Sequence, residues 1–215
     1  MKVSNKLHRV MSIIAAIFLI IHLLSSSVSS VTSIINLAKA GILSSLFLNI
    51  VTNLAGLGSV VLFIVVLFRG KKDLLAGILM FLTILFPVIT IANWMIQLVS
   101  GSIPHFYLAY GLTCLLADFV LLGFRACLGI ECVAGGCLSR GPGKFILMAL
   151  PFMITFLDAL ASVFSLIGSS MGADIAVILP AILTSVTGVL FNGIPMILLG
   201  FAFALPVREQ IPAAQ

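Results

Sequence analysis

The chain has 215 residues, of which 62% are hydrophobic and only 8% are charged, and its formal net charge is +5. A soluble domain carries about a quarter charged residues, so these few could not cover the surface of a soluble fold. The basic residues stand at the ends of apolar stretches rather than in a long run or along one face. That placement argues against nucleic-acid binding and predicts one integral membrane domain over residues 1–215.

Six apolar stretches are long enough to cross the bilayer core as helices, which takes about 20 residues each. Gly, Ser and basic residues punctuate them, and one longer segment, 126–144, is predicted to be a cytosolic loop. The predicted fold class is therefore all-α, a polytopic membrane protein with a six-helix bundle and antiparallel neighbours. The predicted spans are about 10–37, 42–68, 74–99, 104–125, 145–168 and 176–206.

The distribution of Lys and Arg predicts the orientation. With the N-terminus inside, ten of the eleven Lys and Arg residues fall on the cytosolic side, and only Lys39 falls outside. We therefore expect a multi-pass protein of the cell membrane with both termini cytosolic. Trp94, Tyr107 and Tyr110 then lie toward the outer ends of their spans, as interfacial aromatic residues do.

The first span has two interpretations. Lys2, Lys6 and Arg9 precede an apolar run, a pattern shared with secretory signal peptides. Small residues at 25–30 supply a candidate cleavage site. However, the apolar run resumes at Val31 and the serines share one helical face, which favours a retained signal-anchor helix.

Small and polar residues recur at alternating steps of four and three in at least five spans, so each set lies on one helical face. We call these faces the polar seam. Helix packing explains Ser, Thr and Gly there, whereas Asn and Asp favour a hydrated cavity or pathway. The seam comprises His22, Ser26, Ser29, Ser33, Asn36, Ser45, Asn49, Thr52, Gly56, Ser59, Thr83, Pro87, Thr90, Trp94, Gln97, Tyr107, Gly111, Cys114, Asp118, Pro151, Thr155, Asp158, Ser162, Ser165 and Ser169.

Two acids, Asp118 and Asp158, lie near the middle of the fourth and fifth spans. A carboxylate at the centre of a spanning helix costs about 2.5–3.5 kcal/mol on insertion scales, which simple packing does not require. Such acids indicate an ion site, a proton relay or a substrate partner. The alternative is a neutral or paired acid that fixes helix register. Of the nearby basic residues, His22 is assigned to packing and Arg125 is expected to reach the cytosolic interface.

The sixth predicted span contains Asn192-Gly193-Ile194-Pro195 near its midpoint. Asn-Gly favours a turn, and Pro195 removes a backbone hydrogen bond to residue 191. The segment therefore predicts a kink. The alternative is a pair of half-helices whose exposed backbone contacts a substrate or ion, as in many transporters.

Cys127, Cys132 and Cys137 are spaced C-x4-C-x4-C across the predicted loop. This spacing matches no zinc motif, and a cytosolic location argues against disulfides. We interpret them as small, buried interfacial thiols, with acylation of Cys127 or Cys132 as the alternative. Residues 139–144 lack the spacing of a phosphate loop, and no protease or hydrolase motif is present. We therefore predict no enzyme activity, no metal site and no cofactor.

The sequence thus predicts a small transport-related protein, either a carrier or a membrane subunit of a transporter. Its expected partners are the lipid bilayer and a small solute, proton or cation, with a homo-oligomer or a partner membrane subunit also compatible. The alternative is a membrane scaffold, assembly or regulatory protein whose seam packs against partner helices. The candidate substrate- or ion-binding residues are Asp158, Asp118, Asn93, Asn192, Asn49 and Asn53.

Overall fold

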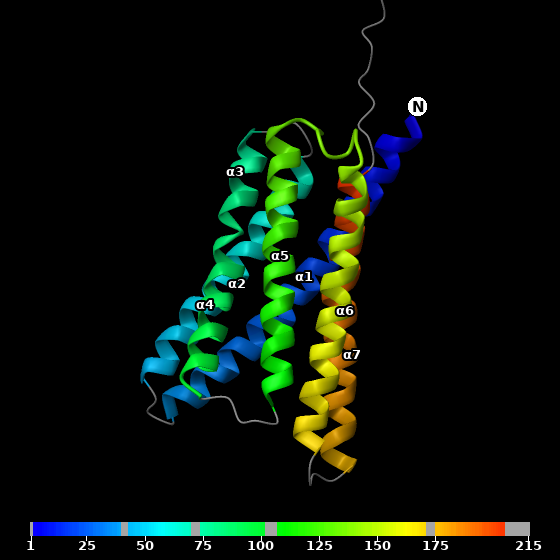
Figure 1. The fold of residues 1–215 in the computed structure, drawn as a ribbon. Coiled ribbons are helices and arrows are strands. Elements are labelled where there is room, and N and C mark those ends of the chain that lie inside the picture. Colours follow the sequence, from blue (N-terminus) through cyan, green and yellow to red (C-terminus); the bar gives the residue numbers. More distant parts are fainter. Residues whose placement is uncertain (1, 40–42, 70–73, 102–106, 171–174, 205–215) are drawn as a thin grey trace, which may run out of the picture.

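The computed structural model describes residues 2–39, 43–69, 74–101, 107–170 and 175–204, which are helical apart from short turns (Figure 1). No strand occurs among these residues, which confirms the predicted all-α class. The helices are α1 (Lys2–Lys39), α2 (Leu43–Arg69), α3 (Leu74–Leu82), α4 (Leu85–Val99), α5 (Leu108–Val133), α6 (Gly143–Ser170) and α7 (Ile175–Ala204).

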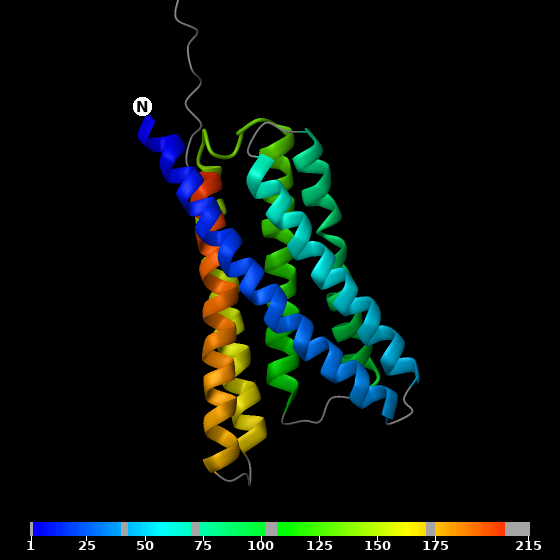
Figure 2. The same cartoon turned by 180° about the vertical axis from the view of Figure 1, so that it is seen from behind.

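Helices that follow one another in the chain also lie side by side, and α1 closes the bundle by packing against α7. Because α3 and α4 continue along one line, they act as a single rod. The described ranges therefore form a ring of six rods (Figures 1 and 2). The start of α1, the end of α7 and the 134–142 connection lie at the same end of this ring, which we call the terminal end.

Four segments are long and apolar enough to cross a membrane, namely 74–99, 108–133, 143–168 and 185–204. Shorter apolar stretches occupy Val10–His22 of α1 and Ile50–Val66 of α2. Large hydrophobic side chains are exposed on every helix. So apolar a surface suits lipid chains rather than water and is compatible with a membrane protein.

The apolar core lies toward the terminal end. Its buried side chains come from the first halves of α1 and α6, from α3, and from the second halves of α2, α5 and α7. Because neighbouring rods run in opposite directions, these portions meet at one end of the ring. Phe63, Phe124 and Phe203 are at most 1% exposed there. Away from this core, Trp94 and Tyr110 pack edge to face with ring centroids 5.6 Å apart.

The third predicted span is interrupted, a feature that the sequence analysis did not predict. α3 ends at Leu82 and α4 begins at Leu85, with Thr83 at the break. Pro87 explains the interruption, because its ring has no N–H and clashes with the carbonyl of residue 83 in a regular helix. The Thr83 hydroxyl instead donates to the Met80 carbonyl at 2.6 Å, which tightens the last turn of α3.

α5 is longer than predicted, because it continues from residue 125 to Val133, so the predicted loop boundary at 126 is wrong. Residues 126–133 stay helical because they pack against α3: Cys132 is fully buried, and the side chain of Phe81 lies against Gly129. The connection to α6 is limited to 134–142. It starts at Gly135 and Gly136, whose φ angles of 62° and 92° lie in the left-handed region that glycine favours.

The cysteines are consequently not all in a loop. Cys127 and Cys132 lie on α5, the second of them buried, and only Cys137 belongs to the connection, where it is exposed. The burial of Cys132 agrees with the prediction of a small, buried thiol, whereas Cys137 is exposed.

The 134–142 connection is anchored by Glu131, whose polar side chain is fully buried. Its Oε2 accepts hydrogen bonds from the backbone N–H groups of Leu138, at 2.9 Å, and Ser139, at 3.2 Å. The Ser139 hydroxyl donates in turn to the Gly136 carbonyl at 3.2 Å. A single carboxylate thereby folds the connection back onto the end of α5.

Replacing Glu131 with alanine is expected to lower the free energy of unfolding by about 2 kcal/mol, because two backbone donors lose a charged acceptor. Thermal unfolding of the detergent-purified protein measures the loss. Cys137→Ser, an exposed change in the same connection, is the control and is expected to leave the melting temperature unchanged. Equal melting temperatures for wild type and Glu131→Ala would contradict the anchoring role.

α7 is one continuous helix through Pro195, so the interpretation as two half-helices is wrong. Close packing against α6 compensates for the hydrogen bond lost at Pro195. A Cβ atom built at Gly193 would lie 2.5 Å from Cγ2 of Thr155, and one at Gly200 would lie 2.5 Å from the Leu147 carbonyl oxygen. The two glycines therefore let α7 lie directly against α6 on both sides of Pro195.

Candidate functional site

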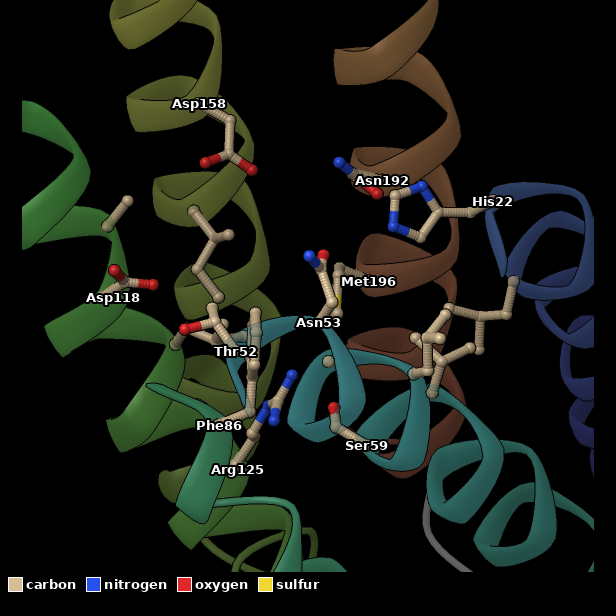
Figure 3. A pocket seen from close by; sticks show the side chains of 17 residues that line it. His22, Thr52, Asn53, Ser59, Phe86, Asp118, Arg125, Asp158, Asn192 and Met196 are labelled. Carbon is tan, nitrogen blue, oxygen red and sulfur yellow. The ribbon is translucent and has the colours of Figure 1, made fainter. Parts of the chain in front are cut away.

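A cavity of about 340 Å³ lies inside the ring, beside the apolar core. All six rods contribute to its wall, which accounts for the recurrence of polar residues on one face of successive helices. Figure 3 shows the polar side chains from different helices converging on this space. Its charged and amide-bearing lining residues are His22, Asn53, Asp118, Arg125, Asp158 and Asn192.

Four of the predicted site residues line this cavity together: Asp118, Asp158, Asn53 and Asn192. They come from α5, α6, α2 and α7, so residues distant in sequence face one space (Figure 3). The seam therefore borders a cavity at this depth rather than a close-packed helix contact.

The other two predicted site residues are placed differently. Asn93 does not line the cavity, and its Oδ1 accepts a hydrogen bond from Nε2 of Gln97, one turn further along α4, at 3.1 Å. Asn49 belongs to α2, but its side chain lies outside the described residues.

Two basic residues that were assigned elsewhere also line the cavity. His22 was interpreted as a packing residue, yet it reaches the wall from α1, and its ring lies beside Asn192 in Figure 3. Arg125 was expected at the cytosolic interface, and this expectation is wrong, because it is only 3% exposed. The sequence did carry a signal: Arg125 follows Asp118 by seven residues, two helical turns, so both lie on one face of α5.

Arg125 is held by three contacts within the bundle. Its Nη1 donates a hydrogen bond to the carbonyl oxygen of Thr83. Its guanidinium carbon lies 5.2 Å from the ring centre of Phe63 and 5.4 Å from that of Phe86, which are cation–π distances. Nε of the same group is buried and has no hydrogen-bond partner.

The break between α3 and α4 explains why Arg125 finds an acceptor there. In a regular helix the carbonyl of Thr83 would accept from the N–H of residue 87, but Pro87 has none. Only the longer contact from the Phe86 N–H, at 3.4 Å, remains within the backbone. The guanidinium therefore supplies the donor that proline removes, and it links α5 to the interrupted rod.

The two carboxyl groups have different surroundings. Asp118 interacts electrostatically with the Thr90 hydroxyl, with Asp158 and with Arg125. Asp158 lies on α6 across the cavity, where Figure 3 shows its carboxyl group pointing toward the enclosed space. Arg125 and Asp118 thus carry opposite charges on the same helix, α5, and interact electrostatically. Asp158 lies on a different helix, α6.

The arrangement can bind a small polar solute or a cation, or hold a proton. A carboxylate in a low-dielectric cavity is stable only when a proton, a cation or hydrogen bonds compensate it. The described residues contain no group of three or more His, Cys, Asp or Glu side chains suited to a metal ion. No protein-family model, curated protein or solved structure matches the chain.

Proposed function

We propose that this chain is a proton-coupled transporter, or the membrane subunit of one, with Asp158 as its proton-binding residue. The observation that carries the proposal is a cavity inside a lipid-exposed bundle, lined by Asp118, Asp158, Asn53 and Asn192. Acidic residues within membrane spans are costly to insert and therefore rare, and those that occur commonly belong to ion or proton pathways. A scaffold role would instead call for a dry, close-packed seam, so the cavity favours transport.

The proposed topology has six spans and both termini in the cytosol of a cell-membrane protein. The common location of the start of α1, the end of α7 and the 134–142 connection supports it. That end carries Arg140 and Lys144, in agreement with the excess of basic residues on the cytosolic side. Leu19 and His22 line the cavity, which supports retention of α1 rather than its removal as a signal peptide.

In the proposed mechanism Asp158 carries the proton and Asp118 stays charged opposite Arg125. A proton neutralises Asp158 while the cavity is closed to water, and its release accompanies opening to the other side. The solute occupies the same cavity. Binding of the solute and binding of the proton therefore change each other's affinity, because both alter the charge of one enclosed space.

Asp158→Asn is expected to lower proton flux by at least about tenfold, equivalent to about 1.4 kcal/mol in the governing free energy. The assay uses proteoliposomes with an internal pH-sensitive dye and an imposed potassium diffusion potential. Asn93→Ala, which changes a polar residue outside the cavity, is the control. Infrared spectra recorded across pH should also lose a protonated-carboxyl band in Asp158→Asn. Wild-type flux and pH dependence in Asp158→Asn would overturn the proposal.

A further inference from the structure

The cavity has charges of both signs in its wall. Arg125 brings a guanidinium that is 3% exposed, is fixed by Thr83 and two aromatic rings, and has an unpartnered Nε. In Figure 3 this group lies at one end of the space, and the carboxyl groups of Asp118 and Asp158 lie away from it. A solute inside would therefore meet a donor of several N–H groups at one end and carboxyl oxygens at the other.

The sum of these charges restricts the solute. With Asp158 protonated, as in the proposed mechanism, Arg125 and Asp118 cancel, and the wall is neutral while His22 is neutral. A monocation or monoanion would then add an uncompensated charge to a low-dielectric space, which is strongly unfavourable. A zwitterion adds no net charge and gives each wall charge a partner. The wall thus favours a solute that carries both signs.

We propose that the cavity binds a small zwitterion, with its carboxylate at Arg125 and its ammonium group at Asp118. The inference rests on the proposed transport function and names its substrate class. The carboxylate accepts from the guanidinium N–H groups that Thr83 leaves available, in the paired geometry that guanidinium and carboxylate favour. Leu57, Leu121, Ile154 and Met196 line the same cavity and contact the methylene groups between the two charges.

Three matched four-carbon probes test the proposal on the wild-type protein: γ-aminobutyrate, butylamine and butyrate. They differ in charge and share their carbon chain. Calorimetric titration of the protein in nanodiscs at neutral pH measures binding. γ-Aminobutyrate is expected to bind about tenfold more tightly than either single-charge probe, because it makes one more charge-assisted interaction.

Two charge-removing variants are expected to change the selectivity in opposite directions. Arg125→Gln keeps a donor for the Thr83 carbonyl but leaves Asp118 unbalanced, so butylamine becomes the preferred probe. Asp118→Asn leaves Arg125 unbalanced, so butyrate becomes the preferred probe. Arg140→Gln, on the exposed connection, is the control and keeps the wild-type order.

Butylamine or butyrate binding as tightly as γ-aminobutyrate to wild type overturns the inference, as does a failure of all three probes to bind. An unchanged order in both Arg125→Gln and Asp118→Asn overturns it as well. In each case proton flux that depends on Asp158 would leave the proposed function standing. Loss of that dependence, with probe selectivity retained, would overturn the transport mechanism instead.

Discussion

Replacing Arg125 with methionine is expected to lower the free energy of unfolding by about 3 kcal/mol, the scale seen when one member of a buried charged pair is removed. Methionine keeps much of the side-chain volume but cannot donate to Thr83 or compensate Asp118. The carbonyl at the α3–α4 break then has only its long contact with Phe86, at 3.4 Å. Unfolding in mixed detergent micelles, followed by circular dichroism, measures the change.

A double-mutant cycle isolates the contact at the break. Pro87→Ala restores an N–H that can bond to the Thr83 carbonyl, so in the Arg125→Met background it is expected to recover about 1 kcal/mol. In the wild-type background Arg125 already occupies that carbonyl, and the same change gains less. Additive effects of the two substitutions would show that Arg125 does not take the place of the missing N–H.

The second large effect is expected at Gly200, where alanine should cost about 2–3 kcal/mol through overpacking. Its Cβ would lie 2.5 Å from the carbonyl oxygen of Leu147 and 2.6 Å from Cγ of Pro151. The first of these is a backbone atom in α6, so relief requires the two helices to separate. Because α6 carries Asp158 and α7 carries Asn192, the cavity wall should change as well.

Gly188 provides the matched control on the same helix. A Cβ atom there would have nothing within 4 Å, so Gly188→Ala is expected to be neutral or slightly stabilising. Both variants are compared by thermal unfolding and by binding of the probes named above. A Gly200→Ala protein as stable as Gly188→Ala would contradict the close approach of α6 and α7.

The sequence was sufficient to predict the helical class, because apolar stretches of about 20 residues or more are characteristic of membrane-spanning helices. It was insufficient at the end of α5, because the approach of Glu131 and the following glycines resembles the start of a loop. What keeps 126–133 helical is contact with α3, which no local pattern encodes. The contact between Gly77 and Val133 joins segments more than fifty positions apart in the chain.

The two prolines illustrate the same limit. Pro87 and Pro195 each remove one donor near the middle of a predicted span, and the sequence pattern predicted a disruption at Pro195. The helix is interrupted at the first, where Arg125 from another helix offers a replacement donor. At the second, Gly193 allows α6 to approach, and α7 continues. The outcome at each proline therefore depends on its tertiary partners as well as on the proline ring.

The acidic residues of the candidate site could be predicted from the sequence, because a charged side chain inside a membrane is costly and therefore indicates a function. Asp118 and Asp158 were identified on that basis, and they share a cavity. Asn93, an uncharged amide that was also a candidate, instead accepts a hydrogen bond from Gln97 on its own helix. Arg125 was misplaced because its distance from the interface depended on the wrong end of α5. An error in one boundary thereby removed the Arg125 guanidinium from the expected site.

The position of the apolar core at the terminal end has an electrical consequence. Close-packed hydrocarbon side chains polarise far less than a cavity lined by amides and carboxyl groups. In a membrane, the transmembrane voltage would therefore change more steeply across the layer that contains Phe63, Phe124 and Phe203 than across the cavity. A unit charge crossing that layer would exchange about 2.3 kcal/mol with each 100 mV. The movement of charge through the core would therefore be more sensitive to voltage than binding in the cavity.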